Sequence, residues 1–399
     1  MKRMKRIFSL LLSVAIVLSM TACKGEKKSV VTDNLPEFSV NGKTDLPGNF
    51  YLSFVYSRNI IMLDGEGNIV WSKHEEQPKE GMQTGWWDFK KHEVDGKTYY
   101  SYHDQTGTYD NYGLEGFAPG ERVILDENFN EIKRITFEES DTVSKGHPLD
   151  GHDFLMIDLD HYILSGYIKE TVDNVPDYPD GSSVVYSYLQ EVDNGEVIWD
   201  WKSSDYPELY SMTVTDASET ANDYANEKTD VPDCIHFNSM RLDENGDLIC
   251  SFRHINSILS LDRSKDKDQI KWKLSGSGDE FGLSEDQKSS CQHYATIDDD
   301  YITIFDNGNK NKKTRICSYK LDTEKMSLSD FCSYEIDGKF SEACGDAQKL
   351  HDETYMIGWG AATKDTKCMS VYDFAADEEL FSVALKNPKN FTYRCVYYE

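Results

Sequence analysis

Three histidines stand at matching positions in three similar segments, and together they carry the chemistry that this sequence suggests. His152 lies in GHDFLMIDLDHYILSGY, His236 in IHFNSMRLDENGDLICSF and His293 in QHYATIDDDYITIFDNG. In each segment an apolar run leads through an acidic turn into a second apolar run, which indicates equivalent places in a repeated unit. A closed ring of such units would aim the three imidazoles at one volume, where they could serve a group transfer that needs no cofactor.

An arginine and an asparagine are expected beside these imidazoles. Arg253 ends the run LICSFR, 17 residues after His236 and across the hairpin whose turn is DENGD, so strand pairing would bring it back to the histidine. Its guanidinium offers forked donors that suit the oxygens of a sulfate, phosphate or carboxylate. Asn238 shares the strand face of His236 and adds a neutral donor for substrate. The remaining candidates lack this register and are expected to be structural or to support the site: His103, His147, His254 and His351.

The cysteines allow a metal site as a weaker alternative. Cys234 stands two residues before His236, and Cys291 stands two residues before His293, so each pair shares one strand face. The four would make a Cys2His2 set, but zinc sites usually show tighter paired spacings, and we expect no metal. The chain has 9 cysteines and no CxxC pair. Several lie in apolar runs, where a free thiol behaves as a small hydrophobe, and their pairing stays open.

The elements that position these residues form a repeat of short strands. One hairpin occurs six times, with alternating apolar residues, an Asp-led polar turn and a second strand. The turn aspartates recur at a period near sixty residues: Asp64, Asp126, Asp193, Asp262, Asp322 and Asp373. No long window has helical periodicity. The pattern predicts an all-β fold, a six-bladed β-propeller over residues 48–399, whose radial repetition protects the strand edges. A β-sandwich or two stacked barrels is the alternative, but neither predicts the same hairpin six times.

The N-terminus reads as an export signal. Four basic residues precede an apolar run from Ile7 to Met20, and the segment ends on Ala22 and Cys23. A small residue before cysteine resembles a bacterial lipobox, so we expect a lipoprotein signal peptide at 1–22, lipidation of Cys23 and a polar tether at 23–47. The protein would then be anchored by lipid to the cell membrane on its extracytoplasmic face. An ordinary signal peptide with an incidental cysteine is the alternative.

The charge of the chain excludes one class of partner. The formal net charge is -29, and removal of the four basic residues of the signal would take it to -33. Such a chain will not bind nucleic acid non-specifically. An anionic ligand would need a local cationic pocket inside this negative field.

Several ordered motifs carry a family resemblance. The segments GHDF, DCIHFNSMRLDENGDLICSFR, IKWKLSG, QHYATI, FDNGN and TRICSYKLD resemble the bacterial aryl-sulfate sulfotransferases that use no nucleotide sulfate donor, most strongly from Gly151 to Asp322. The resemblance implies a six-bladed propeller that moves a sulfuryl group from a phenolic sulfate donor to a phenol acceptor through a sulfohistidine. By motif it implies His293 as nucleophile, with His152, His236, Arg253 and Asn238 at the other active-site positions.

Two features depart from that family, and two other functions stay open. Known members carry a larger N-terminal β-domain used in dimer contacts, whereas about 25 residues separate Cys23 from the first expected blade here, so the oligomeric state is open. The polar stretch from Ser203 to Asp233 is either a lid or a surface loop. Trp86, Trp87 and Tyr112 are candidates for stacking on the phenol. The rival functions are a lipid-anchored propeller that only binds an anionic or aromatic ligand, and a metal-dependent hydrolase.

Overall fold

The computed structural model describes most of the chain outside its N-terminus. The described residues are 28–30, 34–114, 116–175, 181–214, 233–298, 301–362, 366–387 and 389–399. The expected signal peptide and Cys23 lie outside this set, as does most of the polar stretch from Ser203 to Asp233. Among the described residues, no helix is long and apolar enough to cross a membrane.

The fold is all-β, as the sequence predicts, and its strands pair in antiparallel sheets. Three sheets have four strands each, in sequence order. Their strands are β10 (Leu155–Met156), β11 (His161–Val172), β12 (Ser182–Asp193) and β13 (Glu196–Lys202); β14 (Phe237–Leu242), β15 (Leu248–Phe252), β16 (Ser257–Leu261) and β17 (Ile270–Leu274); and β18 (His293–Asp298), β19 (Tyr301–Asp306), β20 (Arg315–Asp322) and β21 (Ser327–Glu335).

Two larger sheets complete the molecule. The eight-stranded sheet contains β3 (Asn49–Phe54), β4 (Asn59–Leu63), β5 (Ile69–His74), β6 (Trp86–Val94), β7 (Lys97–Asp104), β8 (Glu121–Leu125), β9 (Glu131–Ile135) and β26 (Thr392–Tyr398). The six-stranded sheet contains β1 (Lys28–Val30), β2 (Phe38–Gly42), β22 (Asp346–His351), β23 (Thr354–Gly358), β24 (Lys367–Asp373) and β25 (Glu378–Leu385). Thus β2, within the expected tether, pairs with β25.

The six predicted hairpins are all present, and their aspartates explain the turns. They are β4–β5, β8–β9, β12–β13, β16–β17, β20–β21 and β24–β25. The carboxylate of Asp64 accepts a hydrogen bond of 2.8 Å from the backbone N–H of Asn68, and Asp126 does the same for Asn130. These side chains satisfy backbone donors that the turn leaves outside the strand ladder.

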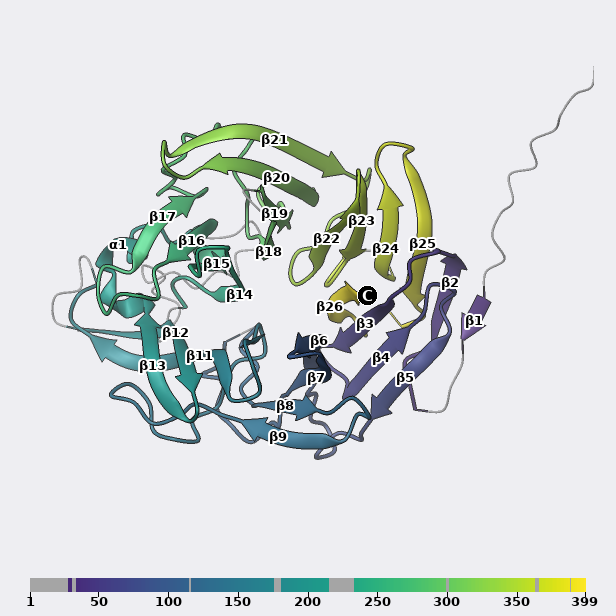
Figure 1. The fold of residues 1–399 in the computed structure, drawn as a ribbon, viewed down its shortest axis with the longest axis horizontal. Coiled ribbons are helices and arrows are strands. Elements are labelled where there is room, and N and C mark those ends of the chain that lie inside the picture. Colours follow the sequence, from purple (N-terminus) through teal and green to yellow (C-terminus); the bar gives the residue numbers. More distant parts are fainter. Residues whose placement is uncertain are drawn as a thin grey trace, which may run out of the picture.

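The sheets surround a common centre, which is a β-propeller-like arrangement (Figure 1). The C-terminal strand β26 lies in the middle of the picture and pairs with β3, so the two ends of the β-rich part meet there. Apolar faces of neighbouring sheets fill the space between them; in the largest core cluster Trp201, Phe252 and Leu259 are almost fully buried. Within the described ranges, short helices lie at connections: 3-10 turns at Ser203–Asp205 and Arg253–Ile255, and α1 (Pro207–Tyr210).

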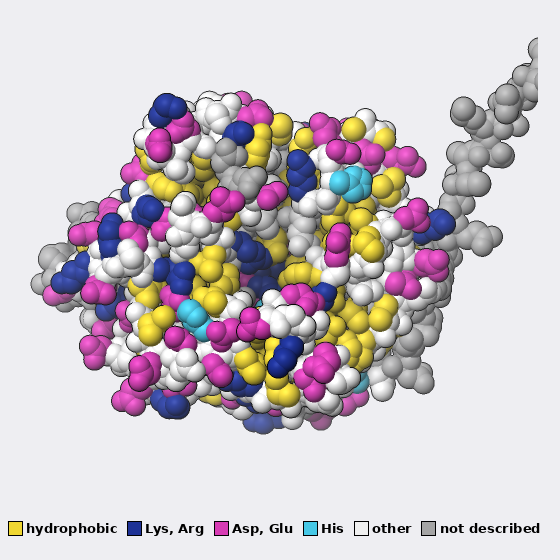
Figure 2. Space-filling view, in the orientation of Figure 1, with side chains coloured by type: hydrophobic (Ala, Val, Ile, Leu, Met, Phe, Trp, Pro, Cys, Tyr) yellow, Lys and Arg dark blue, Asp and Glu magenta, His cyan; other side chains and the backbone are white. Residues whose placement is uncertain are grey.

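The centre of the face seen in Figure 2 is hollowed, and Lys and Arg side chains gather inside the hollow. Acidic side chains are spread over the surface around it. Buried cations include Lys90, Arg122, Arg253 and Arg394. Three of them pair with buried carboxylates: Lys90 with Asp153, and Arg122 and Arg394 with Asp88. The hollow therefore presents cations within a strongly negative chain, which is the local condition that an anionic ligand requires.

Candidate active site

The three predicted histidines start the inner parts of three successive sheets. His152 precedes β10, His236 directly precedes β14, and His293 is the first residue of β18. All are buried, with exposed fractions of 2%, 4% and 3%. The rings of His152 and His236 are 4.9 Å apart at an interplanar angle of 87°. His293 lies within electrostatic range of both. The structure thus brings together imidazoles from three distant stretches of chain.

Two carboxylates hold two of these imidazoles. Nδ1 of His152 is hydrogen-bonded to Asp150, which also accepts the backbone N–H of His152 at 2.9 Å. Nδ1 of His236 lies 2.5 Å from Oδ2 of Asp233. A carboxylate accepts the Nδ1 proton and leaves Nε2 for chemistry. Neither aspartate was predicted from the sequence, although both stand within three residues of their histidine.

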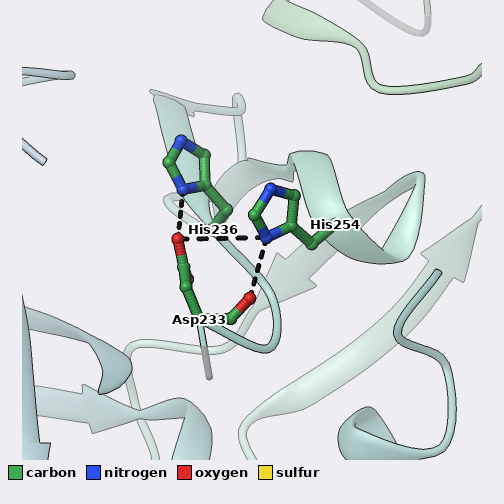
Figure 3. Close-up of side chains that lie close together, drawn as sticks. All are labelled: Asp233, His236 and His254. Atoms are coloured by element: carbon green, nitrogen blue, oxygen red, sulfur yellow. Dashed lines mark hydrogen bonds and ion pairs between the residues drawn. The ribbon is translucent and has the colours of Figure 1, made fainter. Parts of the chain in front are cut away.

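Asp233, His236 and His254 form the one group of possible metal ligands in the described part of the chain (Figure 3). Nδ1 of His254 lies 2.8 Å from the backbone carbonyl of Asp233. A carbonyl only accepts, so this nitrogen carries a proton and has no lone pair for a metal. The group is therefore a hydrogen-bonded network. The Cys-x-His pairs proposed as alternative ligands do not form such a group there.

Burial sets the protonation of this network. It lowers the pKa of His254 to about 3 and also lowers the pKa of His236, an effect that the charge of Asp233 opposes. Burial alone would raise the pKa of Asp233, but His236 and His254 hold it below its usual value. Asp233 is therefore an anion facing two imidazoles, and the ring of His254 stacks on that of His236 at 4.6 Å.

His293 has a different partner. Its Nδ1 lies 2.8 Å from Oδ1 of Asn307, whose amide nitrogen donates to the carbonyls of Ser341 and Cys344. Because carbonyls only accept, the amide orientation is fixed and its oxygen must accept from Nδ1 of His293. Nε2 therefore carries the lone pair, and it accepts the backbone N–H of Cys344 at 3.2 Å.

The charge state of His293 follows from its surroundings. Burial lowers its pKa well below the usual range, and the positive charge of Arg253 adds to that effect. The imidazole is therefore neutral near pH 7, with a basic Nε2. This is the form in which an imidazole acts as a nucleophile.

Arg253 returns to the histidines, as the hairpin predicts. Its backbone N–H donates to the carbonyl of His236 at 2.8 Å. The residue is 7% exposed, and its guanidinium donates to the carbonyl of Glu342 at 3.3 Å. Its positive charge adds to the effect of burial in lowering the pKa of both His236 and His293, so it lies within electrostatic range of the two imidazoles.

Asn238 connects two of the histidine segments. Its Nδ2 donates to the carbonyl of Gln292, the residue before His293, at 2.7 Å. Its Oδ1 is buried and has no hydrogen-bond partner in the described structure. One of the two amide hydrogens of Asn238 thus links the strand of His236 to that of His293.

The aromatic candidates Trp86 and Trp87 differ in whether they lie near the imidazoles. Trp87 lies 5.9 Å from the ring of His152, and Tyr393 lies 5.6 Å from it. Tyr167 is 5.6 Å from the ring of His236. Trp86 instead packs on Tyr102 and donates to Asp104, away from these rings.

A loop between β7 and β8 covers the imidazole of His236. Tyr112, the third aromatic candidate, packs on Phe117 in this loop, and Phe117 packs on Tyr167. Gly116 approaches so closely that a Cβ there would lie 3.0 Å from Cε1 of His236. The loop therefore closes the site on this side.

Of the other candidate histidines, His254 stacks on His236, whereas His103 and His351 have other surroundings. Nε2 of His103 contacts the carbonyl of Ala118 at 2.7 Å, and burial lowers its pKa to about 4. His351 is exposed. The eight described cysteines are free thiols, six of them buried.

Sequence comparison assigns the family. The model of the Arylsulfotransferase (ASST) family matches residues 107–370, about two thirds of the 399 residues. The chain belongs to this family, which implies a sulfotransferase acting on aryl sulfates and phenols. No curated protein matches the chain.

A comparison with solved structures finds similarities at low identity. A protein of unknown function from Bacteroides caccae is 10% identical, with 88% of this chain and 99% of that chain covered and a TM-score of 0.47. A catalytically inactive virginiamycin B lyase from Staphylococcus aureus is 9% identical over 88% and 100%, with a TM-score of 0.40. The periplasmic gluconolactonase of Pseudomonas aeruginosa is 9% identical over 84% and 81%, with a TM-score of 0.43. At such scores these likenesses decide nothing about activity.

Proposed function

We propose that this protein is an aryl-sulfate sulfotransferase that moves a sulfuryl group from a phenolic sulfate ester to a phenol by a ping-pong mechanism. The observation that carries the proposal is the buried, neutral imidazole of His293, whose Nε2 lone pair lies within the field of Arg253. A sulfate monoester bears one negative charge spread over three oxygens, so positioning and charge stabilisation are the main tasks of the site.

In the first half-reaction, Nε2 of His293 gives up the hydrogen bond from the backbone N–H of Cys344 and attacks sulfur while the bond between sulfur and the phenolic oxygen breaks. The Nδ1 proton stays on the ring and is held by Asn307. Arg253 and the second amide hydrogen of Asn238 bind the sulfuryl oxygens. His152 or His236 gives an Nε2 proton to the departing phenol oxygen, and the paired aspartate stabilises the charged imidazole beforehand; at His236 the anion of Asp233 has to offset the burial that lowers the pKa.

In the second half-reaction, the neutral His152 or His236 takes the proton of the incoming phenol. The phenol oxygen attacks sulfur, the bond between sulfur and nitrogen breaks, and His293 returns as neutral imidazole. Charge and protons balance over the cycle, and no cofactor or metal takes part. The closed loop over His236 would keep water from the sulfohistidine.

The same proposal includes the finer architecture and the location. We assign six blades, each completed by an outer hairpin, with β26 and β3 as the inner strands of the first. The lipobox-like segment before Cys23 supports a lipid anchor on the extracytoplasmic face of the membrane.

The test uses the full chain with a chromogenic aryl sulfate. Phenol release that requires an acceptor phenol and persists in chelator is expected, with a mass increase of one sulfuryl group on the peptide that bears His293. His293→Ala should abolish both, whereas His351→Ala, at an exposed imidazole, should change neither.

Other outcomes would identify the rival functions. Release into water that chelator abolishes would favour a metal-dependent hydrolase, and binding without release would favour a ligand-binding propeller. Full turnover by folded His293→Ala would refute the assigned nucleophile.

A further inference from the structure

Four strands at the centre carry register shifts that turn selected side chains inward. The shifts lie between Phe237 and Ser239 in β14, between His293 and Ala295 in β18, between Trp87 and Lys90 in β6, and between Thr392 and Cys395 in β26. A bulge re-aims the side chain of the extra residue. Asp88, Asn238, Tyr294 and Tyr393 lie inside these shifts, and each contacts Arg394, which lies inside the shift of β26.

Arg394 is the centre of these contacts. Its exposed fraction is 1%. One guanidinium nitrogen lies 3.1 Å from Asp88 and 3.6 Å from Asp153, and the other donates to the backbone carbonyl of Asn238 at 2.5 Å. Its guanidinium carbon lies 4.5 Å from the ring centroid of Tyr294 and 4.8 Å from that of Tyr393. One side chain from the C-terminal strand thus touches four other segments.

Three of those segments are the histidine segments. Asp153 directly follows His152, and Tyr294 directly follows His293. Asn238 stands two residues after His236 and also binds the residue before His293. Tyr393, next to Arg394, donates its hydroxyl to the carbonyl of His152 at 3.0 Å. The backbone that carries each imidazole is therefore fixed against the same guanidinium.

We propose that Arg394 is a positioning residue that sets the relative places of His152, His236 and His293. The proposal rests on the proposed function and names a residue that acts through the backbone of the reacting groups. A misplacement of about 1 Å in such a site lowers the rate on the order of 100-fold.

Only an arginine fits these contacts. Its planar group can stack on two rings while its forked donors reach two carboxylates and a carbonyl. Lysine keeps the charge but has neither the plane nor the fork. Burial on its own would lower the pKa of Arg394. Tyr393, Asp153 and Asp88 together raise that pKa above its usual value, and the two carboxylates offset the desolvation of the buried cation.

The test compares Arg394→Lys with Arg58→Lys. Arg58 is also buried, and its guanidinium pairs with Asp104 and Glu75 and stacks on Trp86, none of which lies in a segment that carries a site histidine. Both variants are examined as full chains for thermal unfolding, for kcat and KM, and for the carbon-bound proton resonances of the imidazoles by NMR.

In Arg394→Lys we expect the resonances of all three site histidines to shift together and kcat to fall about 100-fold, with KM for the donor changed less than threefold. In Arg58→Lys we expect a lower Tm with unshifted site resonances and a kcat within threefold of wild type. A second variant, Tyr294→Leu, removes one contact of the guanidinium and should shift His293 more than His152. It also covers the case in which Arg394→Lys does not fold.

Unshifted site resonances and wild-type kcat in folded Arg394→Lys would overturn the proposal. So would an unshifted His293 in folded Tyr294→Leu. Because the resonances are read without substrate, they report on Arg394 even if the wild type transfers no sulfuryl group, in which case the proposed function alone would fail.

Discussion

The group that faces Nδ1 distinguishes the three imidazoles chemically. His152 and His236 face the carboxylates of Asp150 and Asp233, whereas His293 faces the neutral amide of Asn307. A carboxylate stabilises the imidazolium form and an amide does so much less. The first two rings are thereby suited to giving and taking protons, and the third to attacking with a lone pair.

Replacing Asn307 by Asp tests this distinction. His293 attacks only as neutral imidazole, so kcat falls as pH drops through its pKa, which burial holds well below the usual range. A carboxylate at position 307 would raise that pKa, so in Asn307→Asp the loss of kcat should move to higher pH. The measurement is the pH profile of kcat. Asn309→Asp places a charge two residues away without facing the ring and should move the profile less.

The buried imidazole of His103 makes the stability of the fold depend on pH. Burial lowers its pKa to about 4, whereas a histidine in the unfolded chain titrates near 6.5. Between these pH values the unfolded chain binds a proton at His103 that the folded chain does not. The contribution of His103 to the free energy of unfolding is therefore lost as pH falls from about 6.5 to about 4. At roughly 1.4 kcal/mol per pKa unit, the contribution is about 3 kcal/mol.

Urea unfolding at several pH values should therefore show a shallower pH dependence for His103→Gln than for wild type. The control is His351→Gln, at an exposed side chain, which should leave the dependence unchanged. Equal slopes for wild type and His103→Gln would contradict the assignment.

The sequence reveals the imidazoles of the site but not what holds them. His152, His236 and His293 share a register in the repeat, and Arg253 follows from one hairpin, so their meeting could be predicted. Asp150 and Asp233 had a usable signal, because each stands within three residues of its histidine. Asn307 had the same kind of signal as Arg253, because it follows the strand that pairs with the strand of His293. Arg394 had none, since its contacts reach segments that are remote in the chain.

At the scale of elements, the loop between β7 and β8 contains two glycines, Gly116 and Gly113, whose surroundings differ. Gly116 and Gly113 both have positive φ, 83° and 74°, so alanine strains the backbone at either place by about 1–2 kcal/mol. A Cβ at 116 would lie 3.2 Å from Nε2 of His236, whereas one at 113 would meet nothing within 4 Å.

We therefore expect Gly116→Ala to lower kcat about tenfold or more by displacing the imidazole or the loop. Gly113→Ala should lower Tm with little change in kcat. Steady-state kinetics and thermal unfolding of the two variants make the comparison. Equal kcat values would show that the loop moves aside without consequence.

The hairpins could be predicted because period-2 apolar patterns and Asp-led turns are local signals. Asp64 and Asp126 bind the backbone of their own turns, so no distant contact is needed. The pairing of β26 with β3 joins residues more than 300 positions apart and has no local signal. The same holds for β2 on β25.

At the scale of the whole molecule, a net charge of -29 opposes the approach of an anionic donor to the cationic hollow. Raising the ionic strength from about 0.01 M to about 0.15 M shortens the Debye length from about 30 Å to about 8 Å. The value of kcat/KM for an aryl sulfate should therefore rise severalfold, whereas that for a neutral phenol acceptor should change little. A decrease in kcat/KM with added salt would mean that the cations of the hollow, and not the net charge of the chain, govern the encounter.

The pairing of β26 with β3 has a consequence for truncated forms of the protein. A polypeptide cut before Thr392 would lack Tyr393 and Arg394 and, with them, the contacts that join the three histidine segments. If Arg394 positions the imidazoles as proposed, such a shortened product would be inert even though all three histidines are present.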